Sequence, residues 1–244
     1  MKNYQINYKI NKVTHKIIYS NKTSNLVKKD ILKIKNNPKI LFIYDQKIKE
    51  SIIKNYIKTL KSLKNKFFTL PVAGGKQNKD LNLLLNIINI LNKNNFTKNS
   101  IILSIGGGVV GDVSSFAAAL YMRGTFYFHV PSTMTSILDS CIGGKTAINY
   151  DNKINLLGTY YHPFRVYISH EILKYIPERE YRSGFAEAIK CGIIDNKQIL
   201  RILNNDFLKI QNREFKVLKE ISLKVLKSKI KFFINDMREK KKRL

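Results

Sequence analysis

The sequence is poor in cysteine, in acidic residues and in long apolar runs. Its two cysteines, Cys141 and Cys191, are too few for a disulfide framework and lack metal-ligand spacing, so we expect a reducing, cytoplasmic location. No run approaches eighteen apolar residues, and residues 1–5 lead into no apolar signal segment. These absences predict a soluble protein with no membrane-spanning helix.

Acidic residues number 17 against 44 lysines and arginines, which gives a net charge of +27. The excess is mostly lysine, scattered along the chain, and no aromatic-basic module accompanies it, so nucleic-acid binding is not expected. A strongly positive field does attract phosphorylated and carboxylated substrates. With 44% hydrophobic residues in 244, the chain can bury the core of one large domain or two small ones.

Short apolar runs alternate with helical patterns in the first part of the chain. Strands are expected at residues 16–19, 40–44, 67–70 (ended by Pro71), 101–105 and 126–130, and helices at 48–63, 81–91 and 109–120. This alternation predicts a parallel sheet with helices on both faces. Residues 178–194 and 212–236 are helical in pattern without further strands, so we place a domain boundary near residue 176.

Glycines follow the apolar run at 101–105. Gly106, Gly108 and Gly111 have the G-x-G-x-x-G spacing that brings a pyrophosphate to a helix N-terminus. The acid expected about twenty residues later is missing. A glycine turn that serves only close strand–helix packing therefore remains an alternative. Asp45 ends an earlier strand, where an acid binds ribose or caps the next helix.

Two further motifs have simple alternatives. Gly144-Lys145-Thr146 resembles the end of a P-loop, but Asp139 stands where that motif needs glycine, so a nucleoside triphosphatase is disfavoured. Glu187 and Lys190 lie three residues apart on one helix face, which is also the spacing of a local ion pair.

Five stretches together resemble 3-dehydroquinate synthase in order and spacing: residues 106–112, 121–124, 130–133, 139–149 and 183–192. The resemblance implies an N-terminal Rossmann-like NAD-binding α/β domain (residues 1–176) and the start of a helical domain for metal and substrate (177–244). It also implies a homodimer, NAD and a divalent metal (zinc or cobalt) as cofactors, and an active site between the two domains.

The resemblance also assigns roles to residues. The implied NAD contacts are Asp45, Lys79, Gly108, Val109, Val110, Gly111, Asp112, Ser132, Thr133 and Lys145, with Asp45 and Lys79 on the adenosine side. The implied substrate-binding and catalytic set is Arg123, Asp139, Lys145, Asn155, Lys190, Lys229 and Arg243. Glu187 is the implied metal ligand.

The family is a carbon–oxygen lyase of the shikimate pathway, which supplies chorismate and aromatic amino acids. It converts 3-deoxy-D-arabino-heptulosonate 7-phosphate, a phosphorylated keto-acid sugar, into 3-dehydroquinate and phosphate, and NAD is regenerated in each turnover. Two alternatives are a related metal-dependent polyol dehydrogenase and a catalytically impaired, truncated NAD-binding remnant.

The sequence departs from the family pattern at several places. Lys76 replaces a glutamate of the nucleotide loop, and Ile154 replaces a lysine. Its histidines, His15, His129, His162 and His170, do not match the family's two histidine metal ligands, which follow the stretch matching residues 236–244. We therefore expect a fragment or a natural truncation, and exposure of the apolar helix face within residues 221–230.

Overall fold

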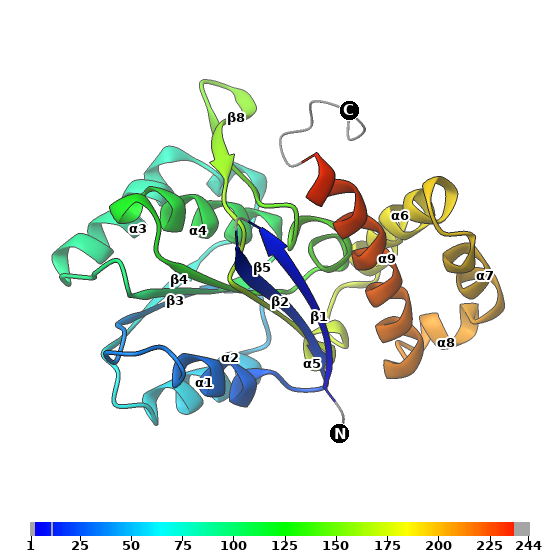
Figure 1. Ribbon diagram of the computed structural model, residues 1–244, viewed down its shortest axis with the longest axis horizontal. Coiled ribbons are helices and arrows are strands. Elements are labelled where there is room, and N and C mark those ends of the chain that lie inside the picture. Colours follow the sequence, from blue (N-terminus) through cyan, green and yellow to red (C-terminus); the bar gives the residue numbers. More distant parts are fainter. Residues whose placement is uncertain (1–2, 11, 237–244) are drawn as a thin grey trace.

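A seven-stranded sheet organises the protein, whose computed structural model describes residues 3–10 and 12–236. The strand order is β1-β2-β9-β6-β5-β3-β4; β1 is antiparallel to β2, and all other neighbours are parallel. The strands are β1 (Tyr4–Ile10), β2 (Val13–Ser20), β3 (Ile40–Asp45), β4 (Phe67–Val72), β5 (Ile101–Gly106), β6 (Phe126–Pro131) and β9 (Arg165–Ser169). A separate hairpin of β7 (Lys145–Tyr150) and β8 (Lys153–Tyr160) projects from the body (Figure 1).

Helices cover both faces of the parallel part of the sheet, as the sequence pattern predicts. Figure 1 shows α1 (Ser24–Ile31) and α2 (Glu50–Lys61) on one side, and α3 (Leu81–Lys93) and α4 (Gly108–Leu120) on the other. Alternate residues of β3 enter the two cores: Phe42 packs with α1 and α2, and Leu41 packs with α3 and α4. Short helical turns complete this part: η1 (Lys76–Asn78), η2 (Tyr121–Arg123), the π-helical η3 (Ser136–Ser140) and α5 (His170–Leu173).

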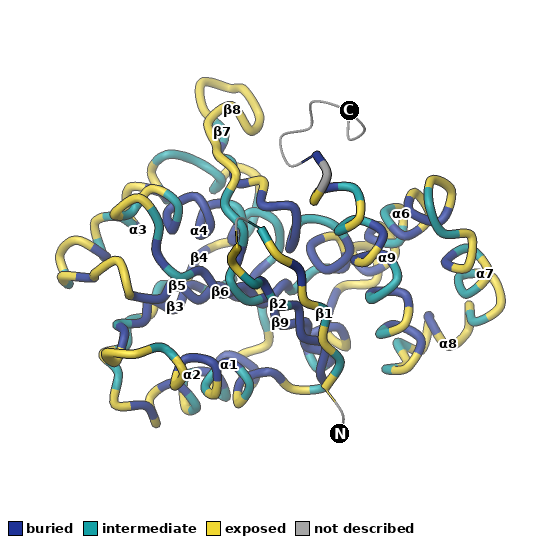
Figure 2. The backbone as a smooth tube through the Cα atoms, in the orientation of Figure 1, coloured by how far each residue is buried: buried dark blue, intermediate teal, exposed yellow. Residues whose placement is uncertain are grey.

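Residues 178–235 are mostly helical and share a core with the β1–β2–β9 end of the sheet. They form α6 (Glu178–Ile194), α7 (Lys197–Asn205), α8 (Phe207–Gln211) and α9 (Phe215–Asn235). Ile221, Val225 and Leu226 of α9 are fully buried with Ile17 and Ile168 of the sheet. The expected exposure of the face within 221–230 is therefore wrong, because β1, β2, α6 and α7 cover it (Figure 2).

Several local predictions need correction. Pro71 does not end a strand: it lies within β4, which tolerates it because β4 is an edge strand and need not donate on its outer side. The patterns of β1, β7, β8 and β9 went unrecognised. Among the described residues, no helix has both the length and the apolar character to cross a membrane.

Candidate active site

The turn from β5 into α4 forms the floor of a cleft of about 470 Å³. Gly107 is the N-cap of α4, and Gly108, Val109 and Val110 follow it along the cleft wall. The first backbone N–H groups of a helix have no partner within the helix, and its dipole favours an anion at this end. The cleft floor therefore has the chemistry of a pyrophosphate site.

Two glycines keep this floor open. A Cβ atom on Gly107 would lie 2.8 Å from the Thr133 Cγ2, so any larger residue at position 107 would clash with Thr133. A Cβ on Gly108 would lie 3.9 Å from the Ser140 Oγ, its nearest neighbour outside the adjoining backbone. Backbone and ligand can therefore approach closely at Gly108, where a methyl group would take up free space.

Gly106 and Gly111 serve packing instead. A Cβ on Gly106 would lie 2.4 Å from the Val110 Cβ, and one on Gly111 would lie 3.1 Å from the His129 ring. Gly111 does not line the cleft. The packing alternative for the glycine motif thus holds at Gly106 and Gly111, whereas Gly107 and Gly108 face the cleft. The helix has turned Gly111 onto β6, and the cofactor contact of this residue stays a prediction.

The side walls of the cleft come from three neighbouring strand ends and from the start of the helical segment. Asp45 ends β3, and Gly74 lies so close that a Cβ there would be 2.5 Å from the Asp45 Oδ2. Ser132 and Thr133 follow β6 and also line the cleft, as predicted. Opposite them, the Tyr175 ring lies 4.0 Å from the Lys49 Nζ in a cation–π contact between two cleft-lining residues. No sequence signal singled out this pair.

A second cavity of about 1300 Å³ lies beyond the first turn of α4. It brings together predicted substrate-binding residues from segments far apart in the chain: Asp139 in η3, Lys145 in β7, Asn155 in β8, Lys190 in α6 and Lys229 in α9. Asp112, one turn into α4 from Gly108, lines it too. Both cavities therefore lie along the N-terminal part of α4, one turn apart.

Charges in this second cavity are arranged in pairs. Lys229 contacts the Asp139 carboxylate and also donates to the Asp139 backbone carbonyl at 2.7 Å. The Lys190 Nζ lies 2.5 Å from the Glu187 Oε2, the local ion pair that the spacing indicated. Burial opposes the charged form of Lys190, but the Glu187 carboxylate and the charge of Asp139 outweigh it and raise the pKa of the lysine. Lys190 is therefore held as a cation.

Lys79 lies on the side of the second cavity. Its Nζ is 2.6 Å from the Asp112 Oδ2 and donates to the Asn155 Oδ1 at 2.5 Å. The segment after η1 thus passes beneath the hairpin, and the adenosine-side contact of Lys79 stays a prediction. Burial raises the pKa of Asp112, the Lys79 charge opposes that shift, and Asp139 adds to it.

Asn149, a motif residue without an assigned role, joins the loop at residues 76–79 to the β7–β8 hairpin. Its Nδ2 donates to the Lys76 carbonyl at 3.1 Å, and its backbone N–H donates to the Lys79 carbonyl at 2.7 Å. Its Oδ1 accepts the Asn155 backbone N–H at 3.1 Å. One side chain thus fixes a loop of the first cavity and a residue of the second.

Some predicted residues are not brought to either cavity. Arg123 is exposed beyond the C-terminal end of α4, near the start of β6, because α4 runs away from the cleft. Arg243 lies outside the described residues. Ile154, where the family pattern has lysine, is 74% exposed on the hairpin. Lys76 lines the first cleft, where it adds a positive charge.

The predicted metal ligand stands alone. Glu187 is half-buried beside Lys190, but the described part of the chain holds no group of three His, Cys, Asp or Glu side chains that could hold a metal. A catalytic divalent ion needs about three protein ligands. These residues by themselves therefore do not fit a catalytic metal, and we derive no step through one.

A family model described as 3-dehydroquinate synthase N-terminal matches residues 69–183. Over 176 residues, the chain is 40% identical to the 3-dehydroquinate synthase of Clostridium tetani (strain Massachusetts / E88), covering 71% of this chain and 46% of that one. The chain is a relative of the 3-dehydroquinate synthases. It spans about half the length of the curated synthases that it matches.

Two solved synthase structures share the fold of this chain. A 2-deoxy-scyllo-inosose synthase complexed with carbaglucose-6-phosphate, NAD+ and Co2+ superposes with a TM-score of 0.88 at 24% identity, covering 99% of this chain and 66% of that one. The 2-epi-5-epi-valiolone synthase ValA from Streptomyces hygroscopicus subsp. jinggangensis 5008, with NAD+ and Zn2+ bound, superposes with a TM-score of 0.85 at 18% identity. This match covers 96% of this chain and 65% of ValA. At these identities the likeness establishes the fold.

Proposed function

We propose that this protein carries the nucleotide half and part of the substrate site of a 3-dehydroquinate synthase. It would act as a lyase on 3-deoxy-D-arabino-heptulosonate 7-phosphate, in the cytoplasm and as a homodimer. The observation that carries the proposal is the adjacency of two cavities at one helix end: a glycine-floored cleft suited to a dinucleotide and a lysine-lined cavity suited to an anionic sugar. The 40% identity to a curated synthase supports it.

The first cavity would hold NAD. The N–H groups at Gly108 to Val110 would bind the pyrophosphate, and Asp45 would accept hydrogen bonds from a ribose. Ser132 and Thr133 would lie toward the nicotinamide. Bound there, the dinucleotide supplies a hydride acceptor that becomes the donor later in the same turnover. The residues bind and orient it.

The second cavity would bind the substrate through its anionic groups. Lys145, Lys190 and Lys229 would bind the phosphate and carboxylate, since a lysine ammonium is a point charge suited to both. Asp139 keeps Lys229 in place, and Glu187 keeps Lys190 charged. We also propose that the chain divides into two parts at residue 176. Glu187 would be one metal ligand, and the other ligands are not among the described residues.

Release of phosphate from the heptulosonate phosphate tests this function. With NAD and Zn2+ or Co2+ present, we expect release without net accumulation of NADH, and Lys145→Ala should slow it about 100-fold. Lys197→Ala, an exposed lysine on α7, is the control and should leave the rate unchanged.

Other results would support the alternatives. Net NADH formation from a simple polyol would indicate the related polyol dehydrogenase. Saturable NAD binding without phosphate release, even at high protein concentration, would indicate an impaired remnant that retains the nucleotide cleft alone.

A further inference from the structure

A third cavity, of about 520 Å³, opens at the N-terminal ends of the parallel strands, whereas the α4 turn lies at their C-terminal ends. It is lined by Phe126 at the start of β6, by Arg165 at the start of β9 and by the chain that follows α1. The proposed NAD cleft lies at the other ends of these strands, roughly 16 Å away at about 3.3 Å per strand residue. A ligand in this third cavity would therefore leave the NAD cleft accessible.

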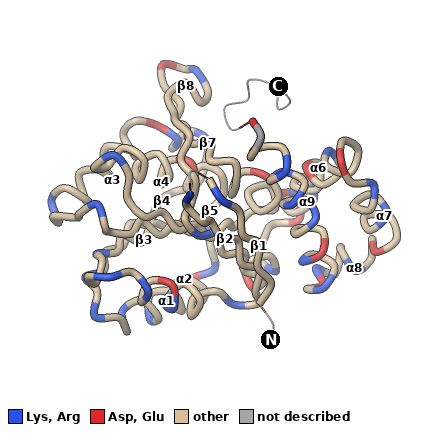
Figure 3. The backbone as a smooth tube through the Cα atoms, viewed as in Figure 1, with Lys and Arg blue, Asp and Glu red and all other residues tan. Residues whose placement is uncertain are grey.

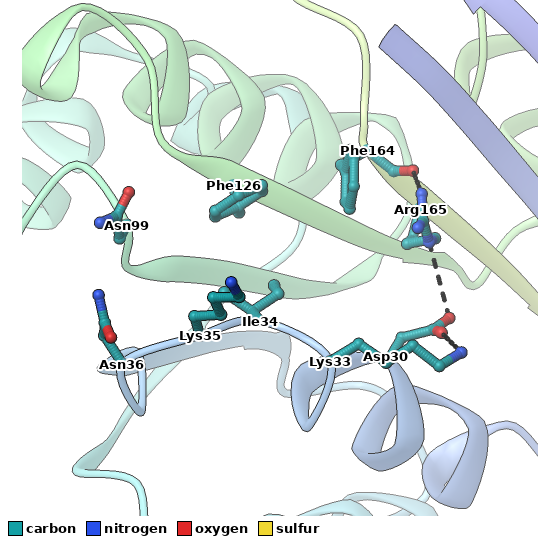
Figure 4. Close-up of a pocket in the computed structure, with 9 residues that line it drawn as sticks. All are labelled: Asp30, Lys33, Ile34, Lys35, Asn36, Asn99, Phe126, Phe164 and Arg165. Carbon is teal, nitrogen blue, oxygen red and sulfur yellow. Dashed lines mark hydrogen bonds and ion pairs between the residues drawn. The ribbon is translucent and has the colours of Figure 1, made fainter.

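Two phenylalanines form one wall of this cavity. The rings of Phe126 and Phe164 lie side by side with centroids 5.2 Å apart and planes tilted by 60°. Figure 4 shows Ile34 and Lys35 facing them from the opposite wall, with the amides of Asn36 and Asn99 at one end. The Arg165 guanidinium carbon lies over the Phe164 ring, 3.9 Å from its centroid, so a flat ring in the cavity would contact Phe126 on one side and Ile34 on the other.

Arg165 gives the other end of the cavity a positive charge. Its Nη1 donates to the backbone carbonyls of Phe164 at 2.7 Å and Thr14 at 3.3 Å, and these are the hydrogen bonds that it makes within the described chain. Its buried Nε has no hydrogen-bond partner there and lies 3.7 Å from the Asp30 Oδ2. This Nε–H is buried next to Asp30, so the donors left for a ligand are those of Nη2, for which the described chain shows no hydrogen bond.

The single carboxylate in the cavity is already engaged. Asp30 accepts a hydrogen bond from the Tyr167 hydroxyl at 2.9 Å and pairs with the Lys33 Nζ at 2.7 Å (Figure 4 shows the Lys33 and Arg165 pairs). Lys35 adds a third cation beside Lys33 and Arg165. Three cations against one anion leave the cavity positively charged, which favours an anionic ligand.

We propose that this cavity binds a small aromatic carboxylate. The ring would lie between Phe126 and Ile34, and the carboxylate would pair with Arg165, while Lys35 on the opposite wall adds positive charge. Arg165 suits this role because its Nη2 makes no hydrogen bond within the described chain, and a hydrogen bond from a guanidinium to a carboxylate is strengthened by both charges. The side-chain amides of Asn36 and Asn99 would accept hydrogen bonds from a polar ring substituent at the far end, or donate hydrogen bonds to it.

Titration with phenylacetate, followed by the NMR signal of the Arg165 Nε–H group and by calorimetry, tests the proposal. We expect saturable binding that shifts this signal and has the same affinity with and without NAD. Acetate lacks the ring and benzyl alcohol lacks the charge, so each should bind about tenfold more weakly. Tighter binding of phenyl phosphate than of phenylacetate would overturn the choice of a carboxylate.

Variants at exposed or partly exposed wall positions complete the test. Lys35→Gln and Phe126→Leu should each weaken phenylacetate binding about fivefold, whereas Lys197→Gln on the distant α7 should not change it. Absence of saturable binding, or equal affinity in all variants, would overturn the proposal. Because the readout is phenylacetate binding, these results do not depend on synthase activity.

Discussion

Ser222 and Ser228 lie six residues apart on α9, and both are buried. The Ser222 hydroxyl has no hydrogen-bond partner among the described residues, whereas Ser228 hydrogen-bonds the Asp195 carboxylate. A buried hydroxyl without a partner costs free energy, and alanine also favours a helix. We expect Ser222→Ala to raise the free energy of unfolding by about 0.5 to 1 kcal/mol and Ser228→Ala to lower it by about 1 kcal/mol.

Urea denaturation of both variants measures this difference. An equal loss of stability in the two would mean that the Ser222 hydroxyl makes a stabilising contact, and it would contradict the account of this helix face.

His129 contributes a pH dependence to stability. Burial beneath α4 lowers its pKa to about 3, although its Nδ1 lies 2.8 Å from the Ser104 hydroxyl. The unfolded chain binds a proton at this histidine below about pH 6.5 and the folded chain does not, so stability falls as the pH drops from 6.5 toward 3. At pH 5 this one histidine should cost about 2 kcal/mol of unfolding free energy relative to neutral pH.

Unfolding of the protein and of His129→Asn between pH 7 and pH 5 measures that slope. The variant is expected to be less stable at pH 7, because Gly111 packs on this ring. Its stability should nevertheless fall less steeply with decreasing pH. Parallel slopes would show that His129 does not titrate as burial predicts.

At the level of elements, the β7–β8 hairpin depends on Asn149. Removing its side chain deletes the bonds to Lys76 and Asn155 while the backbone bond to Lys79 remains. We expect Asn149→Ala to speed amide hydrogen exchange about tenfold in residues 76–79 and 153–160. Asn86→Ala, on the exposed face of α3, should leave exchange in both segments unchanged.

The turn of this hairpin has a local sequence signal, the pair Asp151-Asn152. Asp151 and Asn152 have positive φ angles of 49° and 57°, the geometry of a two-residue hairpin turn that Asp and Asn tolerate. All eight residues of β8 are exposed, including Leu156. The polar–apolar alternation of residues 153–156 breaks at Leu157 and Gly158, so it is too short to mark the whole strand. The helices α2, α3, α4 and α6 were recognisable because their apolar faces recur with helical spacing.

At the scale of the whole molecule, the two cavities differ in how far sequence could predict them. The α4 turn is a local motif, and its glycines predicted the cleft. Lys145, Asn155, Lys190 and Lys229 come from four separate elements, so no local pattern could bring them together, and the family resemblance alone grouped them. The shared core of α9 and β2 was likewise beyond prediction, because it depends on long-range packing.

The net charge of +27 is spread over the whole molecule. Figure 3 shows lysines and arginines on strands, helices and loops alike. Such a field should speed the approach of an anionic substrate and be screened by salt. We expect the KM for the heptulosonate phosphate to rise roughly threefold between 50 and 200 mM salt with kcat unchanged. A KM independent of salt would show that local pairs alone govern binding.

The central claim is that a dinucleotide binds at the glycine floor of the α4 turn. Calorimetric titration with NAD of the protein and of Gly108→Ala tests it most directly. Because a Cβ at Gly108 meets nothing within 3.9 Å, the variant should keep its unfolding midpoint. The methyl group would occupy the pyrophosphate position, so the account predicts one NAD site that the variant weakens at least about tenfold. Equal NAD affinity in the two proteins would contradict it.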